Sequence, residues 1–224
     1  MTGPETHTRG RMPQLHYHPS TASMVPHILL EELGVPFELV FVDRANGAHK
    51  TARYLALNPN GLIPVWVDGD LALYETAAIC LHLVDTHPQA ALAPAPGTPQ
   101  RAQFYKWLMW LTNTLQATLI VYFYPERWAD TPEAIVQVKA HAEARVGGLL
   151  DQLDAELTRH GGPWLLGENF SALDPFTLTL CRWTRHFARP ARGLDRLGLY
   201  LERVLARPAT RRAFEREGLA RPWV

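Results

Sequence analysis

The sequence is poor in cysteine, carries no excess of one charge and contains no long apolar run. Its only cysteines, Cys80 and Cys181, lie far apart inside apolar helical patterns, which argues against a disulfide framework and makes a reducing cytoplasm the expected compartment. Lysine plus arginine and aspartate plus glutamate each number 22, and this balance argues against nucleic acid or a charged membrane surface as the main partner. No run reaches the roughly 18 apolar residues that a membrane-spanning helix needs.

Residues 1–11 lack the apolar segment of a secretory signal, so we expect them to form a polar extension. The composition, with 47% hydrophobic and 20% charged residues, is typical of a globular protein. A chain of 224 residues corresponds to one large domain or two small ones.

The first part of the chain alternates between strand-like and helix-like patterns. Alternating or β-branched segments predict strands, apolar residues at helical spacing predict helices, and Asp68-Gly69-Asp70 predicts the tight turn of a hairpin. The predicted order is a strand at 14–18, a helix at 23–33, a strand at 37–43, a mixed segment at 44–57, a hairpin at 64–75 and a helix at 76–87. This order fits a small mixed sheet with helices packed on it.

A proline-rich segment at 88–99 interrupts this pattern and predicts a linker. The pattern after it is helical. We expect helices at 101–123, 132–159, 171–187, 194–206 and 208–217. The chain therefore divides into a first domain at 12–87, a linker at 88–99 and a helical domain at 100–224.

The segment NPNGLIP (58–64) is the first that indicates ligand binding. Asn, Pro and Gly predict a turn, and Ile63-Pro64 then opens a strand. A cis bond before Pro64 would leave the backbone N–H and C=O of Ile63 free to pair with an extended peptide. The alternative is an ordinary loop proline.

The segment YETAAI (74–79) is the second segment that indicates ligand binding. Thr76 is a good N-cap type, so the last helix of the domain is expected to begin at Glu75-Thr76. Free N–H groups and the helix dipole there favour a carboxylate, and Glu75 can receive an ammonium group. Together they suit the amino-acid end of a γ-glutamyl group, whereas the alternative is plain helix capping.

In order along the chain, these segments resemble the glutathione transferase family. The resemblance covers residues 12–217 and rests on Pro19–Ser23 before an apolar helix, NPNGLIP, YETAAI, the linker and WLLGENFSALD (164–174). In that last segment Ser171 and Asp174 form a capping box, and Pro175 departs from the usual pattern. The resemblance implies an α/β thioredoxin-like N-terminal domain that binds glutathione, followed by an all-α helical C-terminal domain.

The family pattern also implies roles for single residues. Ile63 would pair with the cysteinyl backbone of glutathione, with Pro64 as the cis-proline, and Glu75 and Thr76 would hold the γ-glutamyl end. Lys50 or His49 would reach the glycyl carboxylate. The family further implies a homodimer that detoxifies small electrophiles in the cytoplasm. The nearly all-round apolar pattern of 101–123 supports the homodimer, and we expect no nucleic-acid, membrane or metal partner.

The thiol of glutathione, with a free pKa near about 8.5, needs a hydroxyl donor and a helix N-terminus to ionise at neutral pH. Ala22 stands where the bacterial beta class has its cysteine, and Ser20 stands where the serine-type classes (phi, tau, zeta) carry their serine. We therefore expect Ser20 to be the donor, then Thr21, then Ser23. The alternative is that these residues only form a turn and a cap.

Other departures argue against beta-class and thiol-exchange chemistry. Gln116-Ala117 stands where the beta class has a His-Lys pair, Met109 stands where it has an asparagine, and no Cys-x-x-Cys is present.

The segment YFYPERW (122–128) predicts the second-substrate pocket, with Tyr122, Tyr124, Arg127 and Trp128 as aromatic walls and one cationic group. The alternative, core or dimer-interface packing, is favoured for Trp128 but not for Arg127. The expected function is conjugation of glutathione to a small, apolar or aromatic electrophile. The alternatives are a non-catalytic binding or protein-interaction module, or a glutathione-dependent isomerase, lyase or dehalogenase.

Overall fold

The computed structural model describes residues 12–224, so the expected polar extension at 1–11 lies outside the described residues. The chain begins with a four-stranded sheet made of β1 (Gln14–Tyr17), β2 (Glu38–Phe41), β3 (Val65–Asp68) and β4 (Leu71–Tyr74). The strand order is β2-β1-β3-β4, with β1 parallel to β2 and antiparallel to β3. The predicted strands and hairpin are confirmed, with Gly69 in the left-handed region at the turn.

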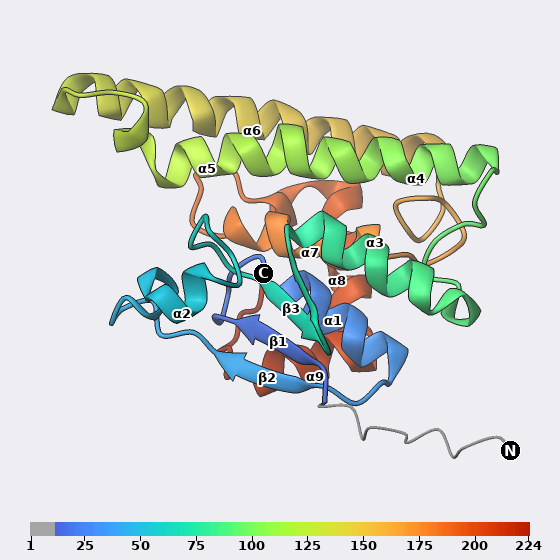
Figure 1. Cartoon of the computed structure of the whole chain (residues 1–224). Coiled ribbons are helices and arrows are strands. Elements are labelled where there is room, and N and C mark those ends of the chain that lie inside the picture. Colours follow the sequence, from blue (N-terminus) through green and yellow to red (C-terminus); the bar gives the residue numbers. More distant parts are fainter. Residues whose placement is uncertain (1–11) are drawn as a thin grey trace, which may run out of the picture.

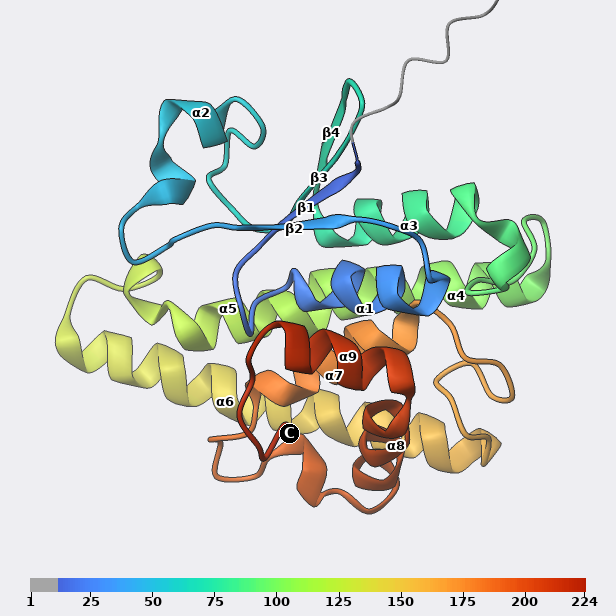
Figure 2. The same ribbon diagram turned by 90° about the horizontal axis from the view of Figure 1, so that it is seen from below.

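Two helices, α1 (Met24–Leu33) and α3 (Thr76–Thr86), pack on one side of this sheet (Figure 2). The short helices η1 (Ala48–Lys50) and α2 (Ala52–Leu55) lie beyond its other side. Residues 24–30 of α1 are all buried, because the helix lies between the sheet and the C-terminal helices α7 and α9. The helix ends where predicted, at the left-handed Gly34, whose N–H bonds to the carbonyl of Leu30.

The helical part begins with two long antiparallel rods (Figure 1). The first consists of α4 (Pro99–Trp110), a π-helical segment η3 (Leu111–Gln116) and α5 (Ala117–Phe123), and it ends before Pro125 as predicted. The second is α6 (Pro132–His160), which Thr131 caps by accepting a hydrogen bond from the N–H of Ala134. The turn η4 (Pro125–Arg127) joins them, and η2 (Pro88–Ala90) lies in the segment between α3 and α4.

The remaining helices are α7 (Leu173–Trp183), α8 (Asp195–Ala206) and α9 (Pro208–Arg216), with the turn η5 (Ala191–Gly193) between α7 and α8. The predicted helix at 171–187 is too long. The chain turns after Trp183, because the Thr184 hydroxyl donates to the carbonyl of Cys181 and accepts from the N–H of Ala191.

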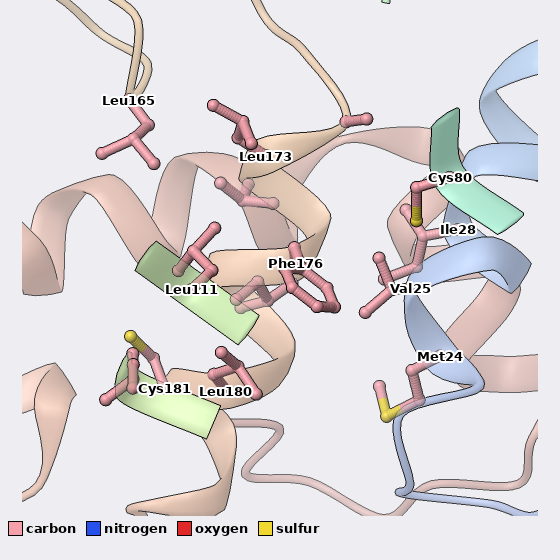
Figure 3. Packing of buried hydrophobic residues seen from close by; sticks show 14 of the residues in the cluster. Met24, Val25, Ile28, Cys80, Leu111, Leu165, Leu173, Phe176, Leu180 and Cys181 are labelled. Carbon is pink, nitrogen blue, oxygen red and sulfur yellow. The ribbon is translucent and has the colours of Figure 1, made fainter. Parts of the chain in front are cut away.

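Helix α7 is buried from Leu173 to Arg182 and packs beside α1 in the core (Figure 3). Its Phe176 lies beside Val25 and Ile28 of α1, so the sheet part and the helical part share one apolar core. Cys80 and Cys181 are free thiols buried in this core, and burial raises the pKa of both. Within residues 12–224, no helix combines the length and apolarity that crossing a bilayer requires.

The expected capping box is confirmed in part: Asp174 reaches back to Ser171 as predicted, but the N-cap of α7 is Ala172 and not Ser171. Asp174 accepts from the N–H of Ser171 at 2.7 Å, and the Ser171 hydroxyl accepts from the N–H of Leu173 at 3.3 Å. The other oxygen of Asp174 accepts from the N–H of Leu165 and the hydroxyl of Tyr200. Pro175 is tolerated because it lies in the first turn, where backbone N–H groups have no partner inside the helix.

Candidate functional site

A cavity of about 610 Å³ lies between the sheet and the helical part. Its helical wall comes from α5, η4 and the end of α7, and its opposite wall comes from the loop before α1 and the segment 44–63. Arg44 Nη2 donates to the hydroxyl of Tyr124 at 3.3 Å and joins the two walls. Among the predicted site residues, the cavity brings together Ser20, Thr21, His49, Lys50, Ile63, Tyr124 and Arg127.

A second, more open cavity of about 860 Å³ lies between α5 and α6 and carries none of the predicted catalytic or glutathione-binding residues. Trp128 lines this cavity and not the first.

The loop before α1 is folded around the carbonyl of His18. This oxygen accepts from the Thr21 N–H at 3.3 Å, the Thr21 hydroxyl at 2.7 Å and the Ser23 hydroxyl at 3.1 Å. Ser23 is fully buried and also accepts from the N–H of His18, so its expected role as a thiolate donor is wrong. A hydroxyl has one proton to donate, and that of Thr21 is used within the loop.

Ser20 differs from both neighbours. Its backbone lies in the left-handed region, with φ of 66°, and its hydroxyl oxygen accepts a hydrogen bond from Arg182 Nη1. Among the described residues, no acceptor takes the proton of this hydroxyl. Ser20 is therefore the loop residue whose O–H is free to donate to a group in the cavity.

The helical part also holds the backbone of Ser20. Its N–H donates to Glu217 Oε2 at 3.0 Å, and its carbonyl accepts from Trp183 Nε1 at 3.2 Å. The other oxygen of Glu217 lies 2.9 Å from Nδ1 of the buried His27. Sequence reasoning missed these partners because they lie 162–197 residues further along the chain.

Arg182 is a buried cation near the end of α7. Burial, and next the nearby Arg185, lower the pKa of Arg182 to about 10, so the guanidinium remains charged at neutral pH. A charged donor to the oxygen of Ser20 polarises the hydroxyl and makes its proton a stronger hydrogen-bond donor.

The bond between Ile63 and Pro64 is cis, as expected. The preceding carbonyl, of Leu62, accepts from the hydroxyl of Tyr54 and the amide of Asn58, both at 2.8 Å. In the part of the chain that the structure describes, no backbone hydrogen bond uses the N–H or C=O of Ile63. The loop therefore presents an unpaired peptide edge to the cavity, whereas Pro64 is buried behind it.

The expected N-cap role of Thr76 is wrong. Helix α3 begins at Thr76, and its N-cap is Glu75, whose φ is 72° and whose side chain makes no capping bond. Thr76 is buried, while Glu75 is exposed. The N–H groups in the first turn of α3 therefore have no side-chain cap, and the exposed Glu75 directly precedes them in the chain. Neither residue is among those that line the cavity.

Tyr122 also lies outside the cavity, so its expected role there is corrected. Its ring packs on Phe187, with the centroids 4.2 Å apart, and Lys139 lies above its face. The cavity is lined instead by Gln116, Ile120 and Phe123, which share one face of the helix because they are four and three residues apart. This spacing is visible in the sequence and could have identified Phe123.

The walls of the cavity carry several cationic groups, namely Arg44, Lys50, Arg127 and Arg185, and no aspartate or glutamate lines it. Burial, together with Arg44 and Lys50, lowers the pKa of His49. The site can therefore hold an anionic, peptide-like ligand against a free backbone edge, beside one polarised hydroxyl.

The chain is similar to known proteins over most of its length. Residues 19–86 match the family model "Glutathione S-transferase, N-terminal domain". The chain is similar to glutathione S-transferase GST-4.5 of Xanthomonas campestris (29% identity; 92% of this chain, 99% of the relative). It is also similar to glutathione S-transferase 3 of Zea mays (33% identity; 81% and 83%). A sphingomonad glutathione S-transferase solved in complex with glutathione superposes with a TM-score of 0.80 at 32% identity, over 92% of this chain and 100% of that one.

Proposed function

The chain belongs to the glutathione S-transferase family, and we propose that the cavity between its two parts ionises glutathione and presents the thiolate to a small, apolar or aromatic electrophile. It is a transferase with glutathione as its cosubstrate. The single observation that carries the proposed mechanism is the Ser20 hydroxyl, which accepts from Arg182 and keeps its own proton for a ligand.

Glutathione would lie along the sheet side of the cavity. The free backbone edge of Ile63 supports pairing with the cysteinyl residue. Glu75 and the first turn of α3 support binding of the γ-glutamyl ammonium and carboxylate groups. Lys50 and His49, which line the cavity, would receive the glycyl carboxylate.

Ionisation would depend on Ser20. Lowering a thiol pKa by about two units requires roughly 2.7 kcal/mol of preferential stabilisation of the thiolate. A hydrogen bond to a charged group contributes about 1.5–3 kcal/mol, and the N-terminus of α1 adds about 0.3–1 kcal/mol. The thiol proton passes to water. The sulfur then forms a bond to the electrophilic carbon, and a leaving group departs with its electron pair.

The test is turnover of 1-chloro-2,4-dinitrobenzene with glutathione, measured beside calorimetric binding of glutathione. We expect binding and turnover, and Glu75→Ala should weaken the binding. Binding without turnover on a broad panel of electrophiles would favour the alternative of a binding module. Unchanged affinity in Glu75→Ala would remove the role given to that residue.

We also propose a cytoplasmic, detoxifying homodimer, with domain boundaries at 12–87 and 100–224. Five of the apolar residues behind the dimer prediction fill the core of their own chain, namely Phe104, Trp107, Leu108, Leu111 and Leu115. The support that remains is the outer face of α4, where Tyr105 and Met109 are each 43% exposed. Light scattering should give about twice the 25.3 kDa chain mass, and a monomer would contradict the proposal.

A further inference from the structure

The four cations of the cavity have no acidic partner. Arg44 and Lys50 belong to the sheet side, Arg127 and Arg185 belong to the helical side, and none forms an ion pair with another described residue. Six other described arginines form ion pairs with carboxylates, namely Arg101, Arg159, Arg189, Arg207, Arg212 and Arg216, whereas no aspartate or glutamate lines this cavity. Unpaired cations gathered around one cavity favour an anionic ligand.

Contacts within the helical part hold Arg127 and Arg185 in place but occupy few of their N–H donors. Arg185 Nη1 donates to the carbonyl of Arg182 at 3.1 Å, at the end of α7. The guanidinium carbon of Arg127 lies 4.2 Å from the centroid of the Tyr124 ring. Each guanidinium has five N–H donors, so most of the donors on both side chains have no partner among residues 12–224.

Glutathione accounts for only part of this charge. If the proposed function holds, on which this inference rests, the glycyl carboxylate takes the sheet-side cations, and the thiolate takes Ser20 with Arg182 behind it. Arg127 and Arg185 then remain on the opposite wall. Beside them lie Phe123 and Trp183, whose rings pack edge to face with their centroids 6.3 Å apart.

We propose that the preferred electrophile is an aromatic anion, with its ring on Phe123 and Trp183 and its acid group on Arg127 and Arg185. A carboxylate or sulfonate matches the fork of a guanidinium, and an aromatic ring matches the apolar wall. The neutral, purely apolar electrophile of the general proposal becomes a weaker substrate.

The probe is 4-chloro-3,5-dinitrobenzoate, with the corresponding benzamide as its neutral partner. In both, the thiolate sulfur bonds to the ring carbon that carries chlorine, and chloride leaves with the electron pair of the broken C–Cl bond. The carboxylate lies across the ring from that carbon, so the arginines can bind it while the reacting carbon faces Ser20. Each enzymatic kcat/KM is divided by the uncatalysed rate constant with glutathione, which removes the difference in intrinsic reactivity.

The measured quantity is the corrected kcat/KM of the benzoate divided by that of the benzamide. We expect a ratio of at least about ten in the native enzyme, the scale of one charge-assisted hydrogen bond. Arg127→Gln and Arg185→Gln should each lower it by roughly tenfold. Arg145→Gln removes one exposed positive charge from the other cavity and should leave the ratio unchanged.

A native ratio near one overturns the inference, and so does an equal loss on both substrates, which would assign the arginines to the thiolate. If neither compound is turned over, the proposed function fails while the inference remains testable. Calorimetry with unreactive 3,5-dinitrobenzoate and 3,5-dinitrobenzamide, at saturating glutathione, then decides it. Tighter benzoate binding that is lost in Arg127→Gln supports the inference, and equal affinities refute it.

Discussion

The carboxylate of Glu217 accepts a hydrogen bond from the backbone N–H of Ser20 at 3.0 Å, across 197 residues of chain. The end of the helical part thus holds the loop that carries Ser20 into the cavity. Because the second oxygen of Glu217 meets His27 in α1, one buried carboxylate connects this loop with the helix that follows it. The geometry of the proposed thiolate site therefore depends on both parts of the chain.

The first prediction concerns Glu217. In Glu217→Ala the N–H of Ser20 and the ring of His27 both lose their acceptor, and each unsatisfied group costs about 1–3 kcal/mol. We expect a lower urea midpoint and a clear loss of kcat. Glu217→Gln keeps one accepting oxygen, so its urea midpoint and kcat should lie between those of the native enzyme and those of Glu217→Ala. Glu202→Gln, on the exposed face of α8, is the matched control. A native kcat in Glu217→Ala would show that Ser20 needs no such anchor.

The second prediction concerns Arg182, which we propose acts through Ser20 as a positioning residue. Arg182→Gln removes the cation that polarises the hydroxyl. The pKa of bound glutathione should rise by about one unit, which corresponds to roughly 1.4 kcal/mol. Arg182→Lys keeps the charge and should restore part of the effect. Ultraviolet absorbance of the thiolate, titrated with glutathione bound, measures this directly. A purely structural role would lower stability in both variants and leave that pKa unchanged.

The third prediction concerns the start of α7. Asp174 accepts four hydrogen bonds, from the N–H groups of Leu165 and Ser171 and the hydroxyls of Ser171 and Tyr200. Asp174→Asn replaces one accepting oxygen by an amide N–H donor. That donor then meets a group that is itself a donor. We expect a loss of about 2–4 kcal/mol in the free energy of unfolding. Tyr200→Phe, which removes one bond, should cost about 1 kcal/mol. Equal urea midpoints for the two variants would contradict this ranking.

How much the sequence could predict depended on the range of the interaction involved. The strands, the hairpin turn at Gly69, the end of α1 at Gly34 and the contact of Asp174 with the N–H of Ser171 are set by neighbouring residues, and all were predicted. The partners of Ser20 were not, because no local pattern marks a residue more than 160 positions away.

Local errors also had physical causes. Thr76 is a good capping residue by type, but the left-handed backbone of Glu75 moves the helix start by one residue and leaves no side-chain cap. The predicted pocket included Tyr122 and not Phe123, whereas the direction that each side chain takes from α5 decides which of the two lines the cavity.

The last prediction separates the hydroxyls of the loop before α1. Ser20→Ala removes a hydrogen bond to the thiolate worth about 1.5–3 kcal/mol, so the pKa of bound glutathione should rise by roughly one to two units. The rate at neutral pH should fall, and much of it should return at high pH, where the thiolate forms unaided. Thr21→Ala should change that pKa less, because the Thr21 proton is donated to His18.

The matched controls use the same titration. Ser23→Ala should mainly lower stability, because the Ser23 hydroxyl is buried against His18. Cys80→Ala and Cys181→Ala should leave the titration unchanged, since both thiols lie in the core. If Thr21→Ala shifts the pKa of bound glutathione and Ser20→Ala does not, the donor is Thr21, and the contact between Arg182 and Ser20 serves only to hold the loop. If neither variant shifts it, backbone N–H groups and the N-terminus of α1 must stabilise the thiolate alone.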